Sequence, residues 1–194
     1  DERGMKPSAL LRNKLFYIMF LLMLCAGASE QGVSQWASAF AEAGLGVSKS
    51  LGDLAGPMLF AILMGTARAI YGKFGHKIDL EKFMLFSSVL CIGSYLLTAL
   101  SPNPVFSLIG CGICGFSVGI LWPGTFSLAC AGIKGGGTLM FALFALAGDI
   151  GCATGPAVVG NAAELLGGSL DLGILCGIIF PVLMTGGLLL YRLS

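Results

Sequence analysis

Six long apolar stretches run through the sequence, and they restrict its possible folds more than any other feature. They cover approximately residues 15–40, 54–73, 83–101, 104–131, 136–160 and 171–191. A helix needs about 20 mostly apolar residues to cross the hydrocarbon core of a bilayer, and these stretches supply that length. They lack the strand-like alternation of apolar and polar residues that a membrane barrel requires. The expected fold is an all-α polytopic membrane protein with six transmembrane helices.

Composition supports this fold class and excludes several others. Apolar residues make up 56% of the chain and charged residues only 11%, whereas a soluble domain carries about 25% charged residues. Disordered chains are polar and rich in charge, so disorder is also excluded. The net charge of +1 leaves no basic face for a nucleic-acid partner. The seven cysteines all lie in apolar stretches, which favours buried packing residues over a disulfide framework.

The basic residues predict how the six spans are oriented. Ten of the eleven fall on one side of a six-span chain, the exception being Lys49; the ten are Arg3, Lys6, Arg12, Lys14, Arg68, Lys73, Lys77, Lys82, Lys134 and Arg192. The positive-inside rule makes that side cytoplasmic, so we expect a multi-pass protein of the cell membrane with both termini in the cytoplasm. Because the sequence begins with Asp1 and not with methionine, we expect a piece or a processed product of something longer.

Several motifs resemble those of the major facilitator superfamily. The segment from Arg68 to Lys77 is similar to the cytoplasmic loop Gly-x-x-x-Asp-Arg-x-Gly-Arg-Arg, with Lys73, Gly75, His76 and Lys77 matching in character. Arg68 and Gly72 depart from it, standing where the first glycine and the aspartate would be. The fourth and fifth spans carry 115–123 and 151–160, which resemble the tenth helix and the Gly-Pro element of a cavity-lining helix. The first span, with 27–30 and Trp36, looks like the seventh helix of fucose-permease-like sugar transporters.

The resemblance extends from about residue 10 to the end and implies the C-terminal six-helix half of such a transporter. It implies a cytoplasmic linker over 1–14 and two inverted three-helix repeats, 15–101 and 102–194. Spans one, two, four and five would line the substrate cavity, with helix bending or gating at Pro123, Gly155 and Pro156. The implied partners are a six-helix N-terminal half, in the same polypeptide or a separate chain, the lipid bilayer, a small-molecule solute and a proton.

Two carboxylates lie near the middle of predicted spans. Glu30 is about 15 residues into the first span and Asp149 is near the middle of the fifth. An ionisable group at this depth is a functional hypothesis by default, because the charged form is costly in a membrane. We expect no Lys or Arg of this chain at the same depth. Each carboxyl is therefore expected to be protonated, solvated in a water-filled cavity, or paired with a cation from outside the chain. Proton coupling by Glu30 and Asp149 is the resulting prediction; helix association through a carboxyl hydrogen bond is the alternative.

Polar side chains on the first span predict a substrate site. Glu30, Gln31, Ser34, Gln35 and Ser38 recur at spacings of three and four, which places them on one broad helix face, with Trp36 on its flank. Amide, hydroxyl and carboxyl groups beside an indole suit a sugar, because they bind hydroxyls and provide a flat surface for the ring. The alternative is a polar seam between helices with Trp36 as an interface anchor. We predict that the substrate-binding residues are Glu30, Gln31, Ser34, Gln35, Trp36 and Trp122.

Motifs of enzyme or metal chemistry have poor support. Gly115-Phe116-Ser117-Val118-Gly119 matches the Gly-x-Ser-x-Gly hydrolase pattern, but that motif requires a strand–turn–helix context. The single histidine, His76, belongs to a surface loop far from Ser117 in depth. Cys111 and Cys114 lie on one helix face without further ligands, which favours packing. We therefore predict neither an enzyme, nor a metal, nor a cofactor.

The leading function is half of a secondary active transporter. It would move a small solute, with a sugar as the candidate, by alternating access as a proton symporter. One alternative is export of cationic or lipophilic compounds, whose charge would pair with the carboxylates. Another is a membrane scaffold or receptor that transports nothing, in which the carboxylates are structural.

Overall fold

The computed structural model describes residues 5–45 and 48–193, and every regular element in these residues is a helix. The elements are α1 (Pro7–Leu10), α2 (Lys14–Ser34), α3 (Ala37–Leu45), α4 (Lys49–Phe74), the 3-10 turn η1 (Gly75–Lys77), α5 (Leu80–Leu100), α6 (Pro104–Val118), α7 (Leu121–Gly132), α8 (Gly137–Leu165), α9 (Leu170–Gly177) and α10 (Ile179–Leu193). The first four residues of the predicted linker lie outside the described part of the chain.

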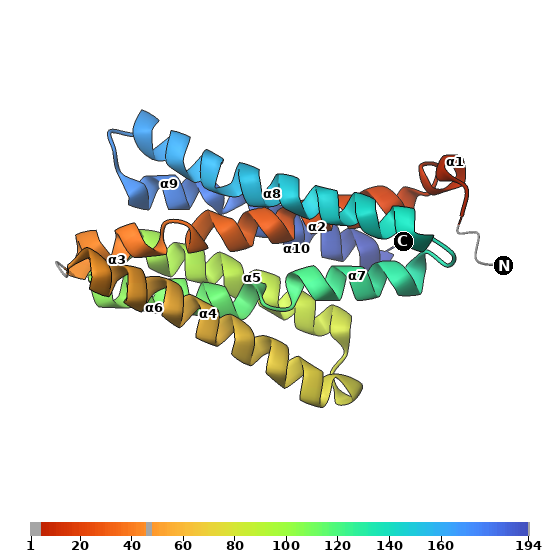
Figure 1. The fold of residues 1–194 in the computed structure, drawn as a ribbon, viewed down its shortest axis with the longest axis horizontal. Coiled ribbons are helices and arrows are strands. Elements are labelled where there is room, and N and C mark those ends of the chain that lie inside the picture. The colour runs from red at the N-terminus through yellow and green to blue at the C-terminus, as the bar shows by residue number, and fades with distance from the viewer. Residues whose placement is uncertain (1–4, 46–47, 194) are drawn as a thin grey trace.

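Six helices or helix pairs are long and apolar enough to cross a membrane. They are Lys14–Ala39, Leu54–Lys77, Leu80–Leu100, Pro104–Gly132, Gly137–Leu165 and Leu170–Leu193. The prediction of an all-α fold with six spans is confirmed. The helices lie side by side along the long axis, and α1, the end of α10 and the α7–α8 connection lie at one end of the bundle (Figure 1). We call this the basic end, because Lys14, Lys134 and Arg192 lie there.

Local sequence signals explain where several helices begin. The side chains of Asn13, Asp79, Asn103 and Ser169 each accept a hydrogen bond from a backbone N–H in the first turn of α2, α5, α6 and α9. Such caps satisfy donors that have no partner within the helix. Three spans are interrupted, at Gln35–Trp36, at Gly119–Ile120 and at Ile178. The interruption at Gly119–Ile120 has a direct consequence for the site described below.

Two seams of small residues hold the centre of the bundle together. On the first, Gly27, Gly151 and Gly155 let α2 and α8 touch through their backbones, since a Cβ on any of them would overlap a carbonyl oxygen of the other helix. On the second, Gly115 lies against the carbonyl of Phe60, which brings α6 onto α4 in the same way. Small residues allow such close approach between membrane helices. The remaining core is filled by large buried side chains, among them Tyr95, Phe144 and Met23.

Candidate functional site

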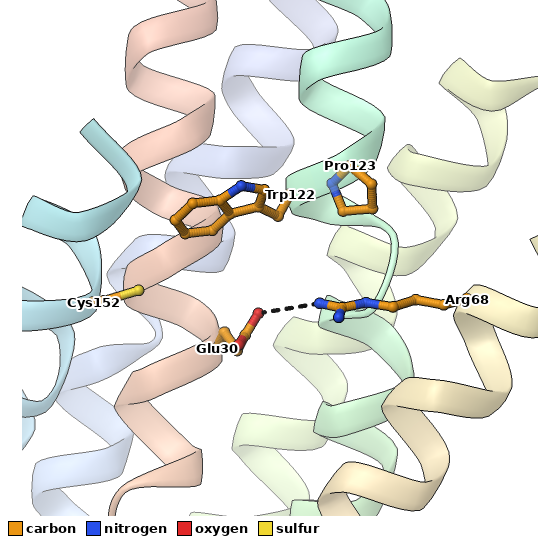
Figure 2. A pocket seen from close by; sticks show the side chains of 5 residues that line it. All are labelled: Glu30, Arg68, Trp122, Pro123 and Cys152. Carbon is orange, nitrogen blue, oxygen red and sulfur yellow. Dashed lines mark ion pairs between the residues drawn. The ribbon is translucent and has the colours of Figure 1, made fainter. Parts of the chain in front are cut away.

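A cavity of about 470 Å³ opens between four helices in the middle of the bundle. It is lined by Glu30 of α2, Arg68 of α4, Trp122 and Pro123 of α7, and Cys152 of α8. Figure 2 shows the carboxylate and the guanidinium pointing toward one another across the cavity, with the indole beside them. A carboxylate, a guanidinium and an aromatic surface therefore line the same cavity.

Glu30 and Arg68 form an ion pair. The Nη2 atom of Arg68 lies 3.9 Å from Oε2 of Glu30, and the two side chains are 46% and 16% exposed. The expectation that no cation of this chain shares the depth of Glu30 is wrong. Arg68 was expected in the cytoplasmic loop, whereas it lies within α4, six residues before that helix ends at Phe74. Its long side chain runs across to α2, and sequence spacing along one helix contains no information about that contact.

Pro123 explains how Arg68 is held. In a continuous helix the carbonyl of Gly119 would accept a hydrogen bond from the N–H of residue 123, but proline has no N–H to donate. The span is interrupted at this point, and Nε of Arg68 donates to the Gly119 carbonyl oxygen at 3.0 Å instead. The guanidinium is thus fixed to α6–α7 through one nitrogen and faces Glu30 with another.

Trp122 is held in the cavity by a glycine on the opposite helix. A Cβ on Gly148 of α8 would overlap the six-membered part of the Trp122 indole, so the ring lies directly on that backbone. The indole is half-buried, which leaves part of its surface available to the cavity. Trp122 therefore provides a flat apolar wall beside the ion pair (Figure 2).

The other predicted substrate residues lie away from this cavity. Gln31 and Ser34 are half-buried in the last turn of α2, and Gln35 is exposed in the interruption before α3. Trp36 donates from Nε1 to the carbonyl of Pro156 at 3.4 Å. A single unbroken helix was assumed for the predicted polar face; the chain instead turns at Gln35–Trp36, so the face ends there.

The second predicted proton carrier has a different environment from the first. Asp149 is exposed on α8, one helical turn before Cys152, and does not line the cavity. Glu30 is the carboxylate that the described structure places in the cavity with a cation. A coupling role for Asp149 stays a prediction.

The residues predicted to bend or gate helices occupy three kinds of position. Pro123 is in the first turn of α7, Pro156 is inside α8, and Gly155 packs on the backbone of Ala28. Lys73 lies in the last turn of α4, and Gly75 and Lys77 are the first and last residues of η1. The structure thus places these three loop residues at the junction of the second and third spans.

The hydrolase-like motif has no catalytic geometry. Ser117 is buried, and its hydroxyl donates to the carbonyl of Cys114 at 2.7 Å. His76 is exposed in η1, and no cluster of His, Cys, Asp and Glu able to hold a metal occurs in the described residues. Cys111 and Cys114 are free and buried.

Reasoning from the sequence missed two residues of the cavity as site residues. Cys152 was interpreted as a packing residue, because cysteines in apolar stretches usually are. Arg68 was assigned to the loop motif; its signal was a charged residue several positions inside the end of a span. An intramembrane charge is a candidate for function, and that rule applied to Arg68 would have found it.

Comparison with known families identifies the chain. The family model described as the Major Facilitator Superfamily matches residues 2–156. No curated protein and no solved structure gives a match. The matched segment includes the first four spans and most of the fifth, with every residue that lines the cavity. The chain therefore belongs to the Major Facilitator Superfamily.

Proposed function

We propose that this chain is the C-terminal six-helix half of a proton-coupled transporter for a small, neutral, polar solute, with a sugar as the candidate. Membership of the superfamily makes secondary transport across a membrane its activity, and it is not an enzyme family. In the proposal, the solute binds in the cavity at Glu30, and the two halves of the transporter rock to expose it to one side at a time. Both termini lie on the cytoplasmic side of the cell membrane.

The observation that carries the proposal is the ion pair beside an indole in one cavity. Glu30 and Arg68 are 3.9 Å apart, which is longer than a direct charge-assisted hydrogen bond of about 2.7–2.9 Å. Solute hydroxyls can therefore accept from the guanidinium and donate to the carboxylate, while a sugar ring lies on Trp122. The likeness of the first span to fucose-permease-like transporters makes L-fucose the first solute to test.

Proton coupling follows from the same pair. Glu30 is mostly covered by protein and depends on Arg68 for compensation of its charge. A proton on Glu30 removes that attraction and frees the guanidinium, so binding of a proton and binding of the solute act on the same contact. Opening of the cavity to the opposite side would then release both.

The position of the second half is proposed from burial. Within the segments that qualify as spans, those formed by α4 and α8 are only 17% and 33% buried, whereas the spans of α2 and α6–α7 are 61% buried. Arg68 and Cys152 of the cavity lie on the two exposed spans. A second bundle that covers α4 and α8 would close the cavity and supply its missing wall.

Export of cationic or lipophilic compounds is the second candidate. It is less well supported, because Arg68 already compensates the charge of Glu30 and leaves it little attraction for a cationic substrate. The exposed Asp149 on α8 is the observation in its favour. The sugar transporter requires Glu30 and not Asp149, whereas the exporter requires Asp149. One experiment on both carboxylates therefore separates the two candidates.

The test uses the assembled transporter in proteoliposomes with a pH gradient. We expect Glu30→Gln to lower gradient-driven accumulation of radiolabelled L-fucose, and of a monosaccharide panel, by at least about tenfold, the factor that corresponds to ~1.4 kcal/mol. Exchange of the same sugar across the membrane, which needs no net proton movement, should continue. Asp149→Asn is the matched carboxylate control and should retain accumulation.

Two results would contradict the proposal, and a third outcome identifies variants that are misfolded. Gradient-driven sugar accumulation that is unchanged in Glu30→Gln would remove the coupling role of Glu30. Absence of transport for every sugar, together with efflux of tetraphenylphosphonium that depends on Asp149, would favour the exporter. Equal loss of accumulation and exchange in both variants would indicate damaged folding, which thermal unfolding of each variant measures directly.

A further inference from the structure

A second cavity, also of about 470 Å³, lies at the basic end of the bundle. It is lined by Asn13, Lys14, Leu15, Glu81, Gly132, Tyr191 and Arg192. None of these residues belongs to the Glu30–Arg68 cavity. Four spans contribute, with the first turns of α2 and α5 and the final residues of α7 and α10. The cavity is therefore a separate feature at the level where the spans leave the membrane.

The charges in this cavity favour an anion. Lys14 and Arg192 are cationic and Glu81 is anionic, which leaves a net charge of +1 among the lining side chains. Arg192 holds Glu81 loosely, with Nε 3.9 Å from Oε2 and both side chains more than two-fifths exposed. Lys14 is the first residue of α2, and the amino end of a helix adds positive potential. A singly charged anion would neutralise the site.

The surface beside the cavity is apolar. The last turns of α10 expose Leu189, Leu190 and Leu193, whose exposed fractions are 47%, 58% and 85%. These residues flank Tyr191 and Arg192 of the cavity itself. A ligand with a phosphate group and hydrocarbon chains matches both parts, because the phosphate occupies the cavity and the chains lie along α10.

We propose that this cavity binds the phosphodiester of an anionic membrane phospholipid in the leaflet at the basic end. Basic pockets between membrane helices near the surface are suited to lipid headgroups. The net charge of +1 selects a headgroup with one negative charge, such as phosphatidylglycerol, over a zwitterionic one. Lys14 and Arg192 hold the phosphate, and Glu81 restrains Arg192 in place.

Native mass spectrometry of the assembled transporter, with dioleoylphosphatidylglycerol titrated into detergent, tests the proposal. We expect one lipid to bind tightly and Lys14→Gln to weaken it about fivefold, since one surface cation contributes this much to binding of an anionic lipid. Lys134→Gln is the matched control: Lys134 lies at the same end but does not line the cavity. It should leave the affinity unchanged, and equal weakening by both variants would overturn the proposal.

A steric variant tests the cavity without changing its charge. A Cβ on Gly132 would lie 2.5 Å from Cδ2 of Leu15, so Gly132→Leu must fill or distort this space. Gly72→Leu is the matched control, because nothing lies within 4 Å of a Cβ at that position. We expect Gly132→Leu to abolish the tight lipid and Gly72→Leu to retain it. Lipid binding that survives Gly132→Leu would overturn the site.

Two further ligands identify the source of the phosphodiester. Glycerophosphoglycerol, which has the headgroup but no acyl chains, should bind at least tenfold more weakly than the lipid. Dioleoylphosphatidylethanolamine should also bind more weakly, because its headgroup is neutral overall. Equal binding of the soluble headgroup would make this a site for a soluble phosphate compound, and equal binding of phosphatidylethanolamine would remove the preference for an anion.

Discussion

Arg68 donates to the carbonyl oxygen of Gly119, the one oxygen that Pro123 leaves without its usual helical donor. Pro123→Ala restores an N–H that competes for this oxygen. We expect the affinity for the solute to fall about five- to tenfold, corresponding to the ~1 kcal/mol of one hydrogen bond. Binding is measured by isothermal titration on the purified transporter. Pro104→Ala is the control, since Pro104 begins α6, where a missing N–H costs nothing. An unchanged affinity in Pro123→Ala would separate Pro123 from the site.

Because Glu30 and Arg68 form an ion pair, we expect their contributions to stability to be coupled. We expect Glu30→Gln and Arg68→Gln each to lower thermal stability, and the double variant to lose less than the sum. The expected coupling is about 1 kcal/mol or less, because Arg68 is 46% exposed and water weakens such pairs. Lys73→Gln paired with Glu30→Gln is the control cycle and should be additive. Additivity for Glu30 and Arg68 would show that the pair is energetically silent.

The contact of α2 with α8 predicts strong sensitivity to one added methyl group. In Gly151→Ala the new Cβ would overlap the carbonyl oxygen of Leu24, a backbone atom that cannot rotate away. We expect a loss of about 1–3 kcal/mol from overpacking. Gly93→Ala on α5 has no atom within 4 Å of its Cβ and should be neutral or stabilising by up to about 1 kcal/mol. Denaturant unfolding in detergent compares them, and equal stability would argue against the seam.

Tyr95 links the third span to the first through a buried hydrogen bond. Its hydroxyl donates to the carbonyl of Ser29 at 2.8 Å, and its side chain is fully buried. Tyr95→Phe should lower stability by about 1 kcal/mol. Tyr17 makes a bond of the same kind and length to Leu11 but is 57% exposed, so Tyr17→Phe should change stability by less than about 0.5 kcal/mol. A larger loss in Tyr17→Phe than in Tyr95→Phe would contradict this ranking.

The stability of the folded protein should depend on pH through the carboxyl group of Asp79. The backbone N–H of Lys82 donates to its carboxylate, and this bond lowers the pKa of Asp79 below the ordinary value. A lowered pKa in the folded protein means that the stabilisation is complete above the unfolded value, about 3.9, and disappears as pH falls through the folded value. Asp79→Asn keeps a capping oxygen but loses the titration. We expect its unfolding temperature to fall less steeply than that of the wild type between pH 4 and pH 2.5. Parallel curves would exclude this contribution.

The six spans were predictable because membrane insertion depends on length and apolarity, which are local properties. The apolar run from 104 to 131 predicted the fourth span within a residue of its structural limits, Pro104–Gly132. Helix bending or gating was predicted at Pro123, whereas the break between α6 and α7 at Gly119–Ile120 was not predicted. A proline weakens a helix, but whether the chain bends or breaks depends on what receives the unpaired carbonyl, here Arg68.

The site was only partly predictable. Glu30 and Trp122 were expected in it, and both line the cavity. Gln31 and Ser34 were placed on the same face by helical spacing, yet they lie beyond the cavity, because spacing describes one helix and the cavity is made by four. Arg68 was missed as a partner of Glu30, since its contact joins residues 38 positions apart through the packing of α4 on α6.

Backbone contact at the two glycine seams determines which motions the bundle allows. Where α2 meets α8, and α6 meets α4, carbonyl oxygens touch glycine backbones, so neither pair can slide lengthwise without a collision. We therefore expect each of these two helix pairs to move as one rigid unit. Glu30 belongs to the α2–α8 pair and Arg68 to the α4–α6 pair. Their ion pair is therefore a side-chain contact between the two helix pairs. In the proposed mechanism, a proton on Glu30 removes the attraction between these two side chains, so protonation would change how firmly one helix pair is held to the other.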